Sequence, residues 1–234
     1  MQSKFIDAAE NGQLNMLKSL ITLPGVNPSA YHNTAFRSAA AKGHLAVLKW
    51  LIKLPGVTPT DMHNMAFIDA ACEGHIDVLK WLICLTGVKP DETDNCAFRW
   101  AASKGRLDVL KWLITLPNVN PTVYDNISFI HAASNGHLDV LKWLITLPDV
   151  DPLSDNNNAL KNATKNGHIN VIHFLQNEEN IKYCVPDKDI LDMLANQISD
   201  LPACQVYCYM HNAYKPETRS KFEHKVAQTL YFKN

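Results

Sequence analysis

Apolar positions along most of the chain follow helical spacing in short blocks separated by polar turns. In the block "HLAVLKWLIKL" (44–54), about 100° of rotation per residue places only Ala46, Lys49 and Lys53 outside a wide apolar arc. A helix with so wide an apolar arc is buried on more than one side. The preceding block, "TAFRSAAAK" (34–42), has one face of alanine and phenylalanine and one variable face. The pattern predicts pairs of helices that stack on further pairs.

This pair of blocks recurs every 31 residues, and glycine, asparagine and proline mark the same places in each repeat. A fixed period of about 20–50 residues is typical of a solenoid, in which each repeat packs on its neighbours. We expect the asparagine to cap the first helix, the glycine to end it in the left-handed conformation, and the prolines to end the second helix. The marker residues are Gly12, Gly43, Gly74, Gly105, Gly136 and Gly167; Asn33, Asn64, Asn95, Asn126 and Asn157; and Pro28, Pro59, Pro90, Pro121 and Pro152.

A tryptophan recurs in the second helix of four repeats. Ser19 and Phe174 stand in its place in the first and sixth repeats, as expected where terminal repeats become caps. We interpret the tryptophans as a ladder of contacts between repeats; the alternative is an aromatic row that binds a cofactor or ligand. The ladder consists of Trp50, Trp81, Trp112 and Trp143.

Composition narrows the class of protein. The 234 residues carry a net charge of −1, so no overall basic field attracts nucleic acid or anionic membranes. No apolar run approaches the ~20 residues of a membrane-spanning helix, and the opening "MQSKFIDAAENG" lacks the apolar core of a secretory signal. The six cysteines are scattered rather than arranged as a disulfide framework, which favours reduced thiols and a cytoplasmic protein.

The segment "TAFRSAAAKGHLAVLKWLI" (34–52) resembles the ankyrin repeat, whose pattern runs T-P-L-H-x-A-A-x-x-G-H-x-x-V-V-x-x-L-L. The resemblance covers six repeats over residues 2–176. It implies an all-α solenoid of stacked helix-turn-helix units, with residues 1–176 as the repeat domain. The T-P-L-H opening is replaced by x-A-F-x, so asparagine is expected to take over the capping role. The period of 31 rather than 33 implies a shorter finger between repeats.

What the resemblance implies about function is a protein-binding scaffold without catalysis of its own. The A-F variant with "LITLPGVNP" endings is similar to ankyrin proteins that intracellular bacterial pathogens deliver into host cells. That similarity implies an effector that reaches the host cytosol by a route independent of a signal peptide. We expect a monomer whose partner is another protein.

The variable face of the first helices indicates where a partner binds. The residues of this face differ freely from one repeat to the next. This face and the finger before each asparagine carry aromatic and apolar residues that a plainly solvated face would lack. Members of the family bind through this concave side of first helices and fingers. The alternative is that these positions vary because nothing constrains them. The predicted contact residues, with Trp100 the foremost, are Tyr31, Arg37, Met62, Ile68, Asp69, Arg99, Trp100, Lys104, Tyr124, Ile130 and His131.

The repeat pattern of the sequence changes after Gln176. The segment "DKDILDMLANQ" (187–197) keeps the phase of a decayed seventh first helix, and prolines at 202 and 216 precede two further helical patterns. We therefore expect residues 177–234 to form a helical cap over the open end of the stack. A docking element or secretion signal is the functional alternative.

The sequence gives only weak evidence for a metal site or a catalytic site. Cys204, Cys208, His211 and His224 have a loose spacing for zinc, and no phosphate-binding glycine loop or nucleophile with an evident oxyanion device is present. The histidines that follow the repeat glycines lie on helices expected about 8–10 Å apart, too far to share one metal ion, so we interpret them as structural. We expect no enzymatic activity, cofactor, metal or nucleic-acid binding. The alternative is an enzymatic or metal-binding tail with the repeats as a targeting module.

Overall fold

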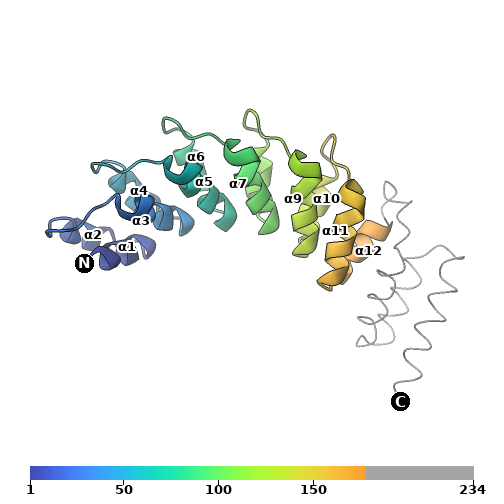
Figure 1. The fold of residues 1–234 in the computed structure, drawn as a ribbon, viewed down its shortest axis with the longest axis horizontal. Coiled ribbons are helices and arrows are strands. Elements are labelled where there is room, and N and C mark those ends of the chain that lie inside the picture. Colours follow the sequence, from blue (N-terminus) through green and yellow to red (C-terminus); the bar gives the residue numbers. More distant parts are fainter. Residues whose placement is uncertain (178–234) are drawn as a thin grey trace, which may run out of the picture. The chain divides into compact units, whose positions relative to one another are not determined.

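The computed structural model describes residues 1–177, which form consecutive pairs of α-helices (Figure 1). The chain divides into two compact units, residues 1–123 and residues 124 onward. The all-α prediction of paired helices is confirmed over the described residues, and the expected cap lies outside them. In the first unit the helices are α1 (Gln2–Glu10), α2 (Leu14–Leu20), α3 (Ala30–Ala41), α4 (Leu45–Leu51), α5 (Asp61–Glu73), α6 (Ile76–Leu82), α7 (Glu92–Ser103) and α8 (Leu107–Leu113).

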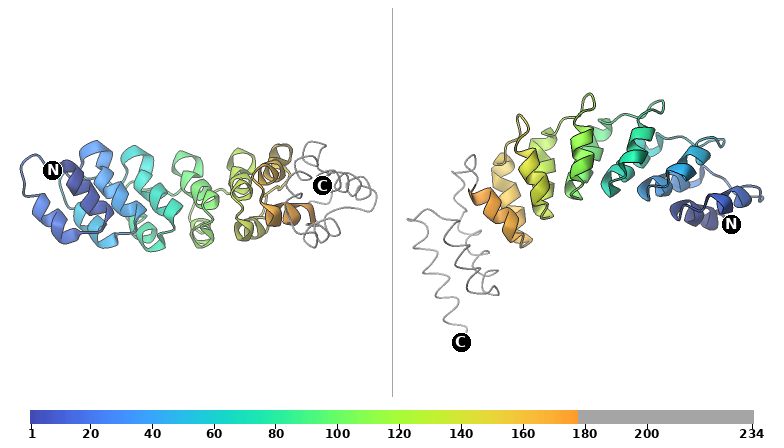
Figure 2. Two further views of the ribbon diagram at one scale, coloured as in Figure 1. Left: turned by 90° about the horizontal axis from the view of Figure 1, so that it is seen from below. Right: turned by 180° about the vertical axis from the view of Figure 1, so that it is seen from behind.

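The first helices of the first unit pack side by side. α3 contacts both α1 and α5, α5 also contacts α7, and each of the four contacts the second helix of its own repeat (Figures 1 and 2). Alanines on the facing sides are fully buried and allow this close approach. A phenylalanine of each first helix and a leucine in the middle of each second helix are fully buried, namely Phe5, Phe36, Phe67 and Phe98 with Leu17, Leu48, Leu79 and Leu110.

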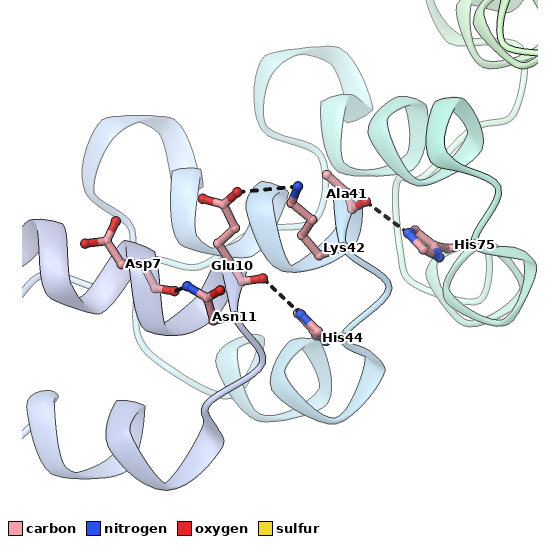
Figure 3. Close-up of polar contacts among 7 residues, drawn as sticks. All are labelled: Asp7, Glu10, Asn11, Ala41, Lys42, His44 and His75. Carbon is pink, nitrogen blue, oxygen red and sulfur yellow. Dashed lines mark hydrogen bonds and ion pairs between the residues drawn. The ribbon is translucent and has the colours of Figure 1, made fainter.

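The glycine and the histidine of neighbouring repeats fit against each other. Gly43 has a φ of +76°, and a Cβ atom there would lie 2.6 Å from Nδ1 of His75 in the following repeat. The His75 Nε2 donates a hydrogen bond to the Ala41 carbonyl (3.0 Å), as His44 does to the Glu10 carbonyl (2.9 Å; Figure 3). Arg106 takes the same role through its Nε, 3.0 Å from the Cys72 carbonyl. These side chains are structural, as the sequence predicted.

Two of the tryptophans, Trp81 and Trp112, also contact the preceding repeat. The ring of Trp81 on α6 lies 6.4 Å from that of Phe36 on α3, and Trp112 on α8 lies 6.4 Å from Phe67 on α5, both tilted. Aromatic pairs in this range add stability beyond the area that they bury. The interpretation of these tryptophans as a ladder between repeats is confirmed.

The second unit is built in the same way over its described residues. Its helices are α9 (Val123–Ser134), α10 (Leu138–Leu144), α11 (Ser154–Lys165) and α12 (Ile169–Asn177). α12 packs on α11 and α10, and the Nε2 of His168 donates to the Ser134 carbonyl at 2.9 Å. A Cβ atom on Gly136 would lie 2.7 Å from Nδ1 of His168, so glycine is required here for the same reason.

The asparagines do not cap the first helices as expected. Each ends a turn of three residues with positive φ that precedes the regular part of the helix, for example Tyr31 (53°), His32 (54°) and Asn33 (55°). The oxygens of the Asn33 and Asn64 side chains accept no hydrogen bond from any described residue, so neither can serve as an N-cap. This prediction was wrong because a left-handed turn, rather than an extended residue, leads into the helix.

Candidate functional site

The left-handed turn recurs before five first helices and sets which side chains are exposed. Its first two residues are exposed and its third is the marker asparagine, which is buried in most repeats. Three non-glycine residues in this conformation cost about 1–2 kcal/mol each. The turns consist of Tyr31–Asn33, Met62–Asn64 and Thr93–Asn95 in the first unit, and Tyr124–Asn126 and Asp155–Asn157 in the second.

Hydrogen bonds to the next loop hold the turns in place. The Asn33 Nδ2 donates to the Asp61 carboxylate (2.6 Å), and the Asn95 Oδ1 accepts from the Asn120 backbone N–H (2.9 Å). Gln2, one period before Asn33, makes both bonds of this kind with the backbone of Asn27 (2.9 Å each). The marker asparagine therefore links repeats. Gln2 was the sign of this role in the sequence, because a glutamine side chain is better suited to bond to the next loop than to cap a helix.

Two arginines predicted to contact a partner also support these turns. The Arg37 Nε donates to the His32 carbonyl (3.2 Å) and its Nη2 to the Thr34 hydroxyl (3.2 Å). Two repeats later, the Arg99 Nη2 donates to the carbonyl of Thr93, the first residue of its turn (3.4 Å). Both side chains are partly buried, so each has a structural role in its own repeat.

Three large apolar side chains stay exposed on the first helices and turns of the first unit. Tyr31 is 69% exposed, Met62 43% and Trp100 49%. Tyr31 and Met62 begin left-handed turns, whereas Trp100 lies on the outward side of α7. We call the outward positions of α1, α3, α5 and α7, with the exposed residues of their turns, the first-helix surface.

Ile68 and Ile130 do not lie on an open surface, contrary to expectation. They are 5% and 3% exposed and belong to the core. α5 packs between α3 and α7, so the flank of α5 that carries Ile68 is covered by neighbouring helices. Ile130 holds the same slot on α9. The helical projection assigned this slot to the outer face because it ignored how closely neighbouring first helices approach.

The remaining predicted residues are polar and lie at or near the surface. Lys104 is exposed at the end of α7, and Asp69 on α5 is half-buried. Burial raises the pKa of the Asp69 carboxyl, Arg37 opposes this, and Glu73 adds to it. In the second unit Tyr124 is exposed and His131 is half-buried, with its carbonyl accepting a bond from Asn135 (2.9 Å).

Groups suited to metal or membrane chemistry were sought over the part of the chain that the structure describes. There, no three His, Cys, Asp or Glu side chains come together, and no helix is long and apolar enough to cross a membrane. Burial raises the pKa of the Cys72 thiol, which disfavours the reactive thiolate. Cys204, Cys208, His211 and His224 lie outside the described residues, so the absence of metal and catalysis stays a prediction.

Comparison with known proteins identifies a family pattern and a fold. The family model for ankyrin repeats (three copies) matches residues 5–94 and 98–187. The crystal structure of the ankyrin repeat domain of human ASB11 is similar with a TM-score of 0.57 and 19% identity, covering 85% of this chain and 98% of that one. At that identity the likeness concerns the fold alone. Comparison with curated proteins gave no match.

Proposed function

Because the chain belongs to the ankyrin repeat family, we propose that it is a non-enzymatic scaffold that binds a partner protein through the first-helix surface. Its first helices and turns pack on a core in which glycine–histidine and asparagine contacts join neighbouring repeats. Such a support presents side chains with little conformational freedom, which lowers the entropic cost of binding.

The observation that carries the proposal is the exposure of Trp100. The same slot holds Asp7, Ser38 and Asp69 in the other repeats of the first unit, so the fold does not need a tryptophan there. Its exposed half amounts to roughly 100 Å², and burying it against a partner contributes about 2–3 kcal/mol. Exposed tryptophan and tyrosine are typical of the residues that dominate protein interfaces.

Affinity capture with quantitative mass spectrometry tests the proposal. The full chain and a Trp100→Ala, Tyr31→Ala variant are used as baits in cytosolic extract, and each captured protein is then purified and its Kd measured. We expect at least one protein whose Kd rises more than tenfold in the variant. Lys111→Ala is the matched control, because Lys111 is exposed on α8, away from the first helices.

Circular dichroism first establishes that all three proteins are equally folded. If every captured protein binds the double variant as tightly as the unchanged chain, the first-helix surface of residues 1–123 is not the binding site.

Action inside a host cell is a further part of the proposal. It is supported only by the similarity of the "LITLPGVNP" endings to those of effectors from intracellular bacteria. A reporter enzyme fused to the chain tests it: activity should appear in the cytosol of cells infected with a secretion-competent bacterium and be lost with a secretion-deficient strain. Reporter activity that is equal in both strains contradicts delivery.

A further inference from the structure

Charges in the C-terminal halves of the first helices alternate in sign from one repeat to the next. The outward slots of the first repeat carry acidic residues, those of the second basic, those of the third acidic and those of the fourth basic. The four pairs are Asp7 and Glu10, Arg37 and Lys42, Asp69 and Glu73, and Arg99 and Lys104. These eight charges cancel over the first unit, and the N-terminal parts of the same helices add the basic Lys4 and the acidic Asp61, Glu92 and Asp94.

Two of the acidic residues pair with a basic residue of the next repeat. The Lys42 Nζ lies 3.5 Å from the Glu10 carboxylate (Figure 3), and the Glu73 carboxylate lies 3.3 Å from the Arg106 Nη2. Carboxylates beside the left-handed turns are engaged as well: Asp61 accepts from Asn33, and Glu92 lies 3.7 Å from the His63 Nδ1. Several charges of this surface therefore already have a counter-charge or a donor within the protein, namely Glu10, Lys42, Glu73, Asp61 and Glu92.

This pattern limits what a charged partner can gain. Neighbouring first helices lie about 8–10 Å apart, close to the Debye length of about 8 Å at physiological salt. A partner segment with one sign of charge, crossing several repeats, meets attraction at one repeat and repulsion at the next. It would also have to displace existing ion pairs. The field of this surface therefore favours neither acidic nor basic segments.

Among the described residues, nothing covers the exposed parts of the large apolar side chains. Trp100, Met62 and Tyr31 are the large exposed groups of the surface, and they come from three different repeats. We infer that the first-helix surface recognises an uncharged protein segment with aromatic or long aliphatic side chains that crosses several repeats. This inference rests on the proposed function, whose site it shares, and adds the chemistry of the partner.

Selection from a random peptide library displayed on phage tests the inference. The full chain is the bait, and enriched peptides are synthesised and their Kd measured by fluorescence anisotropy at low and high NaCl. We expect peptides with near-zero net charge and aromatic or aliphatic side chains. Their Kd should change less than about twofold with salt, because no net charge is screened. It should rise at least about tenfold in Trp100→Ala and stay unchanged in the control Lys111→Ala.

The other outcomes separate the two claims. Enriched peptides with several charges of one sign, weakened more than about tenfold by salt yet sensitive to Trp100→Ala, overturn the inference and leave the binding surface standing. Peptides that bind both variants and the unchanged chain equally contradict the surface itself. A library without any peptide that prefers the unchanged chain over Trp100→Ala also overturns the inference, because an apolar segment would then not suffice for recognition.

Discussion

Replacing Gly43 by alanine measures how tightly the repeats are fitted together. At a φ of +76° an alanine costs about 1–2 kcal/mol in backbone strain. Its Cβ would also lie 2.6 Å from Nδ1 and 2.8 Å from Cε1 of His75, so the ring must move. Overpacking of this kind costs about a further 1–3 kcal/mol, including the weakened bond from His75 to the Ala41 carbonyl. We therefore expect a total loss of about 2–5 kcal/mol in the free energy of unfolding.

Gly25 provides the matched control. It has a similar φ of +82°, but nothing lies within 4 Å of a Cβ built on it. Gly25→Ala should therefore cost only the strain, about 1–2 kcal/mol. A second control is His75→Ala, since removing the ring removes the clash: in that background Gly43→Ala should cost no more than Gly25→Ala does in the unchanged chain.

Guanidinium unfolding followed by far-UV circular dichroism gives the comparison, with both midpoint and m-value recorded for each variant. Equal midpoint shifts for Gly43→Ala and Gly25→Ala would contradict a tight fit between Gly43 and His75. That fit is also refuted if His75→Ala leaves the cost of Gly43→Ala unchanged, because the histidine would then have no part in requiring glycine.

Three further predictions concern single contacts. Asn126→Ser should lower the free energy of unfolding by about 1–2 kcal/mol more than Asn156→Ser, a control at a similar φ. The reason is that serine cannot reach the Asp151 N–H and the Ser154 hydroxyl, which both bond to Asn126. Equal denaturation midpoints for the two variants would restore the capping interpretation. Arg106→His should cost less than Arg106→Ala in a thermal melt, because histidine makes the same carbonyl bond in other repeats. Asp69→Asn should raise the denaturation midpoint at pH 7 and lose this advantage below pH 3.8. Because the pKa of this carboxyl is higher in the folded than in the unfolded state, the carboxyl destabilises the fold as pH rises from the unfolded pKa through the folded pKa. A difference in midpoint that does not depend on pH would contradict this.

The repeat architecture was predictable because its signals are redundant. A period of 31 residues, a glycine with a left-handed requirement and an apolar arc too wide for one interface all point to stacked helix pairs. The roles of Trp81 and His75 followed from the same logic, since equal slots in a stack make equal contacts. None of these inferences needed the exact geometry of a loop.

The left-handed turns were not predictable in the same way. Asparagine is favoured both at N-caps and at positive φ, so Asn33 alone fits either role. Tyr31 and His32 give no sign of positive φ, because tyrosine rarely adopts it and the surrounding hydrogen bonds impose it. Those bonds run to Asp61 and its neighbours, some 28 residues away, which single-residue preferences do not report.

The near-identity of the repeats has a physical cause that also locates the functional residues. The glycine, histidine, tryptophan and asparagine slots each contact a neighbouring repeat or its loop, so stacking alone explains why they stay the same. Variation is then necessary for a recognition residue but does not suffice. The slot of Ile68 and Ile130 holds arginine or lysine in other repeats, and yet both isoleucines are buried. Exposure supplies the second condition. The large apolar residues that meet both conditions on the described first helices and turns are Tyr31, Met62, Trp100 and Tyr124. Folding gains nothing from leaving these four in water, and a partner that covers them is the physical reason we propose for their presence.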